Sequence, residues 1–197
     1  MKTLFSELRA SLLLTLVFAL LLCGAYPVAV WAAGQLLFPA QANGSLVRDP
    51  DGRVRGSWLL AQNFTSPATF HPRPSAAGTG YDAANSSGTN LGPTSKKLAD
   101  AIHDAVEAYR KENNLPADAS VPADAVTSSG SGLDPHISVA NARWQAPRVA
   151  SARHLPLVDV LAQIDAATDR RSWGVLGEPG VNVLRLNRAL DERTVRP

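Results

Sequence analysis

Charged residues are absent from a long stretch near the start of the chain. No Asp, Glu, Lys or Arg occurs between Arg9 and Arg48. Within it, residues 10–33 are apolar enough to cross a bilayer, which takes about 20 residues in a helix. We therefore predict a short cytoplasmic tail at residues 1–9, a transmembrane helix at 10–33 and an extracytoplasmic α+β domain at 34–197.

A cleaved signal peptide is the competing interpretation of the apolar segment. A signal peptide has a basic start and an apolar core of about 7–15 residues. The apolar run here is longer, and Trp31 stands where an interfacial aromatic anchor is expected. These features favour an uncleaved anchor. The basic residues flanking the span are balanced, so the orientation rests on the short tail, which is easy to leave inside.

Cysteine is nearly absent as well. The single Cys23 lies within the apolar segment, which excludes disulfides and thiolate metal sites from the rest of the chain. The four histidines are widely scattered, so we predict no metal site.

The chain has 19 basic and 17 acidic residues and no basic run interleaved with aromatics. This pattern argues against a nucleic-acid partner.

The common catalytic motifs are also missing. Ser131 lies between Gly130 and Gly132, whereas a nucleophile elbow requires G-x-S-x-G. A membrane-anchored hydrolase is therefore only a remote alternative. The Gly-rich turn could instead present backbone N–H groups to a phosphate. The more ordinary interpretation is a tight turn capped by Asp134 or Ser138.

The remaining pattern predicts a mixed α+β domain. Asp49-Pro50-Asp51-Gly52 between two apolar runs predicts a hairpin at 45–61. Residues 62–93 lack periodicity, and a loop of that length is either functional or disordered. Helical periodicity and stop signals predict the elements that follow. These are a helix from Thr94 or Ser95 to Asn113, a strand at 125–127, a helix from Ser138 that Pro147 ends or kinks, a helix after Pro156 with Leu157, Val158, Leu161 and Ile164 facing inward, and a strand at 181–186.

Four blocks of sequence resemble a known family. They are Phe70–Ser75 (FHPRPS), Ser87–Pro93 (SGTNLGP), Thr127–Ser138 with Gln145 and Arg148–Ala150 following, and Gly177–Leu184 with Leu186 and Asn187. In these blocks and in its single N-terminal span, the chain resembles the C subunit of the Kdp potassium-transporting P-type ATPase. Thr89, Val139 and Pro147 depart from the family pattern, and Pro147 puts the helix geometry near Gln145 in question.

The resemblance implies an accessory role in a bacterial inner-membrane complex. The partners would be a channel-like potassium-translocating subunit, an ATP-hydrolysing P-type subunit, a small single-span subunit and the membrane lipid. The chain lacks the Asp-Lys-Thr-Gly motif of P-type pumps. By resemblance it would be a catalytic chaperone that raises the pump's affinity for ATP. The nucleotide contacts implied are Ser129, Gly130, Ser131, Gly132 and Gln145, while potassium is transported by the complex and not bound here.

A second hypothesis follows from the predicted topology. A domain outside the cytosol cannot touch ATP, so any effect on ATP would have to be indirect. The domain would instead cap the potassium entrance as a binding module, with residues 62–93 as the docking surface. Aromatic residues and Arg dominate interface energetics, which selects Phe64, Phe70, Arg73 and Tyr81 as anchors. Their alternative role is to pin this loop to the domain's own core.

Overall fold

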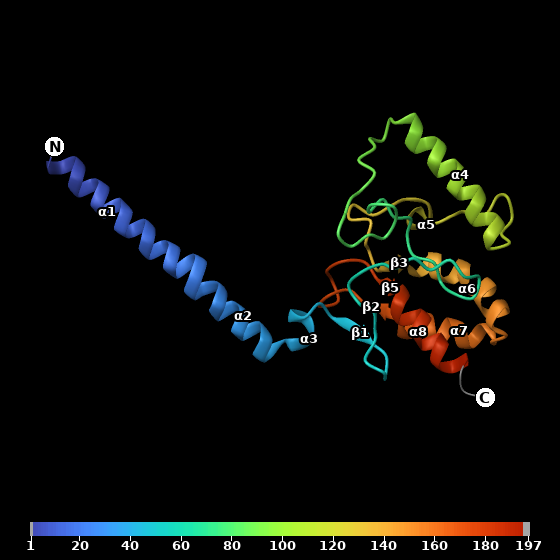
Figure 1. The fold of residues 1–197 in the computed structure, drawn as a ribbon. Coiled ribbons are helices and arrows are strands. Elements are labelled where there is room, and N and C mark those ends of the chain that lie inside the picture. Colours follow the sequence, from blue (N-terminus) through green and yellow to red (C-terminus); the bar gives the residue numbers. More distant parts are fainter. Residues whose placement is uncertain (1, 195–197) are drawn as a thin grey trace. The chain divides into compact units, whose positions relative to one another are not determined.

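The computed structural model describes residues 2–194 and divides into two compact units. Unit 1 runs up to Ser57, and unit 2 begins at Trp58. Figure 1 shows the long helix of unit 1 and the helices and small sheet of unit 2. The fold class predicted from the sequence, one N-terminal apolar helix followed by a mixed α+β domain, is confirmed.

Unit 1 consists of the apolar helix and a hairpin. The helix is built from α1 (Lys2–Phe18), a π-helical stretch (Ala19–Ala25) and α2 (Tyr26–Leu37). Over Thr3–Leu37 it is long and apolar enough to cross a membrane. The π-helical stretch ends two residues before Pro27, which has no N–H to donate, and the Tyr26 N–H reaches back five residues to Leu21 O. The predicted hairpin is confirmed as β1 (Leu46–Arg48) and β2 (Val54–Ser57), which follow the short α3 (Pro39–Ala42).

Unit 2 packs helices against a small antiparallel sheet. The sheet has the order β3 (His136–Ser138), β5 (Gly180–Asn182), β4 (Thr168–Asp169). The packed helices are α6 (Val139–Arg153), α7 (Leu157–Ala166) and α8 (Val183–Thr194). The fully buried core includes Phe70, Ile137, Ala142, Ala146, Val149, Val160, Ile164, Val181, Leu186 and Leu190. Phe70 comes from the irregular segment at residues 62–93 and not from a helix or strand.

Capping residues explain where two helices begin. The side chain of Ser95 accepts a hydrogen bond from Leu98 N at the start of α4 (Lys96–Glu112), and Ser138 does the same for Asn141 N at the start of α6. Both helices were predicted. Pro147, however, does not end α6, which continues to Arg153. Pro147 lies on the exposed side of the helix, where water can bond the carbonyl left without its partner.

Two other local predictions are wrong, and a third is confirmed only in part. Residues 125–127 belong to no strand, because α5 (Ala123–Val126) forms a helical turn there. The strand predicted at 181–186 ends at Asn182, and α8 takes over. The helix predicted after Pro156 is confirmed as α7, and Ile164 and Leu161 face the core as predicted. Leu157 and Val158, however, are exposed, and the fully buried Val160 faces inward instead.

Candidate functional site

Two buried side-chain amides hold the backbone of Phe70 and His71. Asn187 on α8 accepts from Phe70 N (2.8 Å) and donates to Phe70 O (3.0 Å). Gln145 on α6 accepts from His71 N (2.8 Å) and donates to His71 O (3.1 Å). Each amide therefore satisfies one residue's N–H and C=O, as a neighbouring strand would. We call Asn187 and Gln145 the amide pair.

The amide of Gln145 has its full complement of hydrogen bonds. Besides its bonds to His71, Oε1 accepts from Arg148 Nη2 (2.9 Å) and Nε2 donates to Asn141 Oδ1 (2.9 Å). A carboxamide offers two N–H donors and two lone pairs on oxygen, and here all four are used. The side chain is 2% exposed. A nucleotide could bond to this amide only by displacing part of the domain's own network.

The network continues through Asn141 toward α4 and α5. Tyr109 donates its hydroxyl to Asn141 Oδ1 (2.8 Å), and Asn141 Nδ2 donates to Asp124 (3.0 Å). Asp124 also accepts from the backbone N–H and the hydroxyl of Ser138. Burial, together with the nearby Asp124 charge, raises the pKa of Tyr109. The phenol thus remains a neutral donor at physiological pH.

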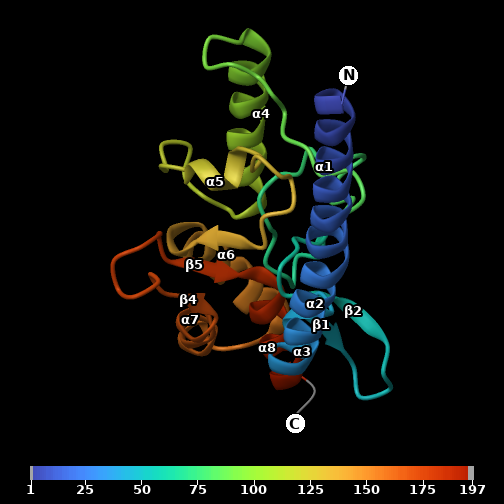
Figure 2. The same cartoon turned by 90° about the vertical axis from the view of Figure 1, so that its left-hand side faces the viewer.

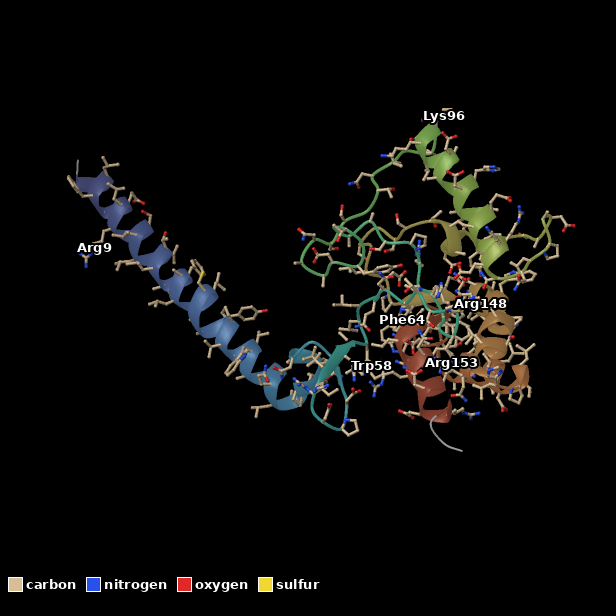
Figure 3. All side chains as sticks on the ribbon, turned by 45° about the vertical axis from the view of Figure 1, so that its right-hand side comes forward. Arg9, Trp58, Phe64, Lys96, Arg148 and Arg153 are labelled. Atoms are coloured by element: carbon tan, nitrogen blue, oxygen red, sulfur yellow. The ribbon has the colours of Figure 1, made fainter. Side chains whose placement is uncertain are left out.

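Two arginines of α6 fix the residues just before Phe70. Arg148 donates to Pro67 O (2.6 Å), Thr69 O (3.0 Å) and Asn113 Oδ1 (3.0 Å). Arg153 donates to the intervening Ala68 O and pairs with Asp191 (2.8 Å). Figure 3 labels both arginines among the helices of unit 2. Burial lowers the pKa of Arg148, an effect that the charge of Glu112 opposes.

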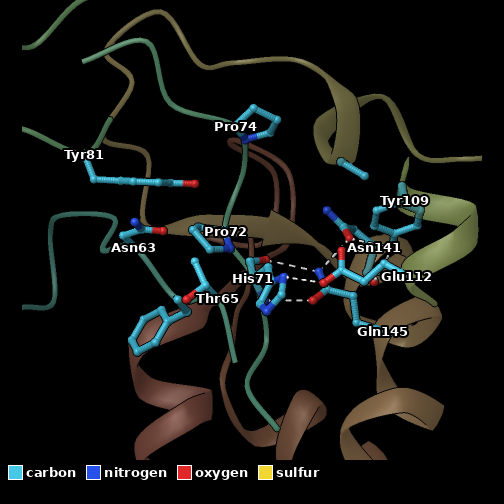
Figure 4. A pocket seen from close by; sticks show the side chains of 12 residues that line it. Asn63, Thr65, His71, Pro72, Pro74, Tyr81, Tyr109, Glu112, Asn141 and Gln145 are labelled. Atoms are coloured by element: carbon cyan, nitrogen blue, oxygen red, sulfur yellow. Dashed lines mark hydrogen bonds and ion pairs between the residues drawn. The ribbon is translucent and has the colours of Figure 1, made fainter. Parts of the chain in front are cut away.

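A cavity of about 250 Å³ lies beside this network (Figure 4). His71 Nδ1 lies 2.9 Å from Glu112 Oε1, which ties the segment to α4 at the cavity wall. Pockets that take drug-sized ligands begin at about 300 Å³, so this cavity is small for a nucleotide. The residues that line it are Asn63, Phe64, Thr65, His71, Pro72, Pro74, Tyr81, Tyr109, Glu112, Ala125, Asn141 and Gln145. Gln145 thus lies at the cavity, and the lining includes no residue of the Ser129–Gly132 turn.

The Ser129–Gly132 turn is a docking point for residues 75–88 of the same chain. Ser87 N donates to Ser131 O (3.0 Å), and Ser75 Oγ donates to Gly132 O (2.7 Å). Gly132 has φ +67°, and a Cβ there would lie 2.7 Å from both Ala77 N and Ser87 O. The position therefore needs glycine for its conformation and for the close backbone approach. Six residues farther on, Ser138 caps the helix α6.

The predicted partner anchors face largely inward. Phe70 is 0% exposed and Phe64 packs against the core, so Phe70 has no surface to offer a partner. Arg73 pairs with Asp134 (3.1 Å) and donates to Ser128 O, while Tyr81 donates its hydroxyl to Arg73 O (2.9 Å). This placement favours the alternative role of pinning residues 62–93 to the core. An interface role for Phe64, Arg73 and Tyr81 stays a prediction.

Several residues of the site were not singled out from the sequence as site residues. Asn141, Asn187, Arg148 and Tyr109 carry much of the network, yet their partners lie far away in sequence. An Asn or Gln on a helix is a weak sign of a buried hydrogen-bond network, because the sequence is the same whether the amide is buried or exposed. Within residues 2–194, no group of three or more His, Cys, Asp or Glu side chains is placed to hold a metal. The arrangement is suited to fixing a backbone in place.

The chain is similar to known proteins over nearly its whole length. A family model described as the K+-transporting ATPase, c chain (KdpC) matches residues 8–192. The Potassium-transporting ATPase KdpC subunit of Mycobacterium tuberculosis is 58% identical over 94% of this chain and 97% of the relative. The corresponding subunit of Caulobacter vibrioides is 55% identical over 95% and 94%. That of Myxococcus xanthus is 58% identical over 85% and 79%.

These matches agree with the apolar helix and mixed domain of the structure. They also fit the resemblance carried by the four sequence blocks. The relatives are named as the C subunit, an accessory rather than the catalytic subunit of the potassium-transporting complex. The chain therefore belongs to the KdpC family of K+-transporting ATPase subunits.

Proposed function

We propose that this subunit acts by docking, and that the exposed side of residues 62–93 is its docking surface on the channel-like potassium-translocating subunit. The observation that carries the proposal is the order of this long segment. It contains neither helix nor strand, yet the amide pair, Arg148, Arg153 and the Ser129–Gly132 turn fix its backbone. Long irregular segments in compact domains are commonly functional, and a preorganised loop loses little entropy on binding.

Docking would promote assembly and stability of the complex with the ATP-hydrolysing and small single-span subunits. In the same proposal the subunit is a catalytic chaperone that raises the pump's ATP affinity indirectly. Indirect action requires that the complex exists in two states and that docking and ATP binding both favour the same one. The fully used amide of Gln145 supports this route over direct contact. The second candidate, a cap over the potassium entrance without a nucleotide role, differs only in leaving ATP affinity unchanged.

Direct nucleotide contact at Ser129–Gly132 and Gln145 depends on which side of the inner membrane the domain occupies. We propose a cytoplasmic N-terminus and an extracytoplasmic domain. Ser131 is exposed, and Cys23 lies in the apolar helix, so a Ser131→Cys variant can be labelled with a membrane-impermeant maleimide. Labelling in intact cells is the expected result. Labelling only after permeabilisation would contradict the orientation and make direct contact the leading mechanism.

The docking surface is tested with two matched substitutions. Ala83 is exposed within residues 62–93, and Ala108 is exposed on α4. Ala83→Arg should reduce recovery of the other subunits in affinity purification several-fold, because a long charged side chain obstructs a close interface. Ala108→Arg should leave recovery unchanged. Equal recovery of both variants would contradict the docking surface.

The effect on ATP is measured on the same preparations. If the chaperone role holds, the ATPase activity of complex lacking a docked C subunit has a higher KM for ATP than the intact complex. Re-addition of the wild-type subunit should restore the lower KM. An unchanged KM together with lost potassium affinity would favour the cap without a nucleotide role.

A further inference from the structure

Loop 170–179, which joins β4 to β5, presents apolar side chains to solvent. All ten of its residues are exposed. At its tip Trp173 is 90% exposed, Val175 71% and Leu176 54%. Figure 2 shows the loop, coloured orange to red, reaching outward from β4 and β5. A tryptophan this exposed, next to two further apolar side chains, is unusual on a soluble surface and indicates a partner.

The loop is folded, so this exposure is not a consequence of fraying. Ser172 N donates to Leu176 O (2.8 Å), and Leu176 N donates back to Ser172 O (3.0 Å). Arg171 and Glu178 pair across its base (2.9 Å). Trp173 has φ +53°, a conformation that bulky residues rarely adopt. Strain of this kind persists where the surroundings impose it, and it is concentrated at functional sites.

We propose that Trp173, Val175 and Leu176 insert into the lipid interface of the bilayer that the chain's own apolar helix crosses. Tryptophan is the residue most characteristic of the membrane–water interface, because its ring is apolar with one polar N–H. The covalent anchor keeps the domain at a membrane, so the tip need only bind weakly. Arg170 is exposed at the base of the same loop, and a cation there is attracted to anionic headgroups when the loop approaches a membrane.

The size of the tip favours lipid over a protein partner. Each side of a stable protein interface buries about 800 Å². A tryptophan contributes at most about 250 Å², and the smaller Val175 and Leu176 contribute less. Three side chains on a narrow loop therefore fall short of a protein interface. The same three side chains suffice for shallow insertion, in which single residues partition independently.

The test uses the assembled complex reconstituted in vesicles of phosphatidylethanolamine and phosphatidylglycerol. An environment-sensitive NBD label is attached at Val175→Cys in a Cys23→Ser background, and some lipids carry a spin-label quencher near the headgroup. A matched control carries the label at Ala108→Cys on the exposed side of α4. We expect blue-shifted emission at position 175 and at least twofold stronger quenching than at 108. Adding Trp173→Ser should reduce that quenching.

Two results would overturn the proposal. Water-like emission at 175, with quenching equal to that at 108, would show that the tip stays in solution. Blue-shifted emission without lipid quenching would show that a protein surface covers the tip. Circular dichroism of the labelled chains separates either result from misfolding. Neither depends on the Ala83→Arg experiment, so failure here leaves the docking surface intact.

Discussion

Residues 62–93 and loop 170–179 are both irregular, but they are held in opposite ways. The first segment passes through the core and is fixed by side chains from α6 and α8, which begin at Val139 and Val183. The second is held by its own backbone bonds and by the Arg171–Glu178 pair. The first turns its aromatic Phe70 inward, and the second turns Trp173 outward. An aromatic residue in a loop is therefore buried where other parts of the domain hydrogen-bond the loop backbone, and exposed where the loop bonds only to itself.

The largest expected effect comes from removing half of the amide pair. Gln145→Ala deletes four hydrogen bonds and leaves buried groups of His71, Asn141 and Arg148 without this partner. Each buried group left unsatisfied costs about 1–3 kcal/mol, so we expect a loss of about 3 kcal/mol in the free energy of unfolding. Denaturant unfolding of the full chain in detergent measures it. Gln163→Ala, at a half-buried position on α7, is the control.

The same variant separates a structural role from nucleotide binding. If Gln145 acts on the backbone of residues 62–93, Gln145→Ala lowers stability and complex recovery together. A raised KM for ATP, with normal stability and recovery, would contradict this and support direct contact with nucleotide.

The next effect comes from the turn that receives residues 75–88. Gly132→Ala places a Cβ within 2.7 Å of two backbone atoms, at a φ of +67° that alanine disfavours. We expect a loss of about 2 kcal/mol in unfolding free energy. Gly130 is the matched control, because a Cβ there would meet nothing within 4 Å. Equal losses of unfolding free energy for Gly130→Ala and Gly132→Ala would show that the turn needs glycine for backbone flexibility in general, and not for the close backbone approach at Gly132.

Elements with local signals could be predicted from the sequence. The hairpin followed from Asp49-Pro50-Asp51-Gly52, and α4 followed from its apolar periodicity and its Ser95 cap. The strand predicted at 181–186 was wrong because the prediction used only the alternation of apolar and polar residues and did not consider that Asn182 can cap a helix. Asn182 Oδ1 accepts from Arg185 N, which starts a helix inside the alternating pattern.

The network at the site could not be predicted in the same way. Gln145 bonds a residue 74 positions away, and Asn187 bonds one 117 positions away. Such contacts depend on which helices pack together. Residue periodicity in a single sequence shows which face of a helix is buried, but not which distant segment it contacts. The resemblance to a family drew attention to Gln145, but it implied a nucleotide contact, whereas the structure gives the amide four internal bonds.

A smaller effect is expected at the root of loop 170–179. Burial raises the pKa of the Asp169 carboxyl, but hydrogen bonds from Arg185 and His136 outweigh this and hold it below the usual value. A lowered pKa in the folded state contributes stability above about pH 4, which is lost as pH falls through the folded pKa. Asp169→Asn should thus cost less than about 1 kcal/mol at pH 7, since the carboxylate is half exposed. The difference in unfolding free energy between Asp169→Asn and wild type should vanish in acid, which denaturant unfolding at neutral and at acidic pH measures.

The smallest effect, and the one of opposite sign, is expected at the tip of that loop. Trp173 is 90% exposed at φ +53°, so its side chain contributes little packing while its backbone is strained. Glycine adopts this φ without strain, and Trp173→Gly should leave the unfolding free energy unchanged or raise it by up to about 1 kcal/mol. Trp144→Gly, within α6 and 37% exposed, should lower it by about 1 kcal/mol or more. A loss at Trp173 as large as that at Trp144 would mean that the tip packs against the domain. An unchanged or raised stability would mean that the tryptophan serves a surface outside the chain, because the fold itself gains nothing from keeping it there.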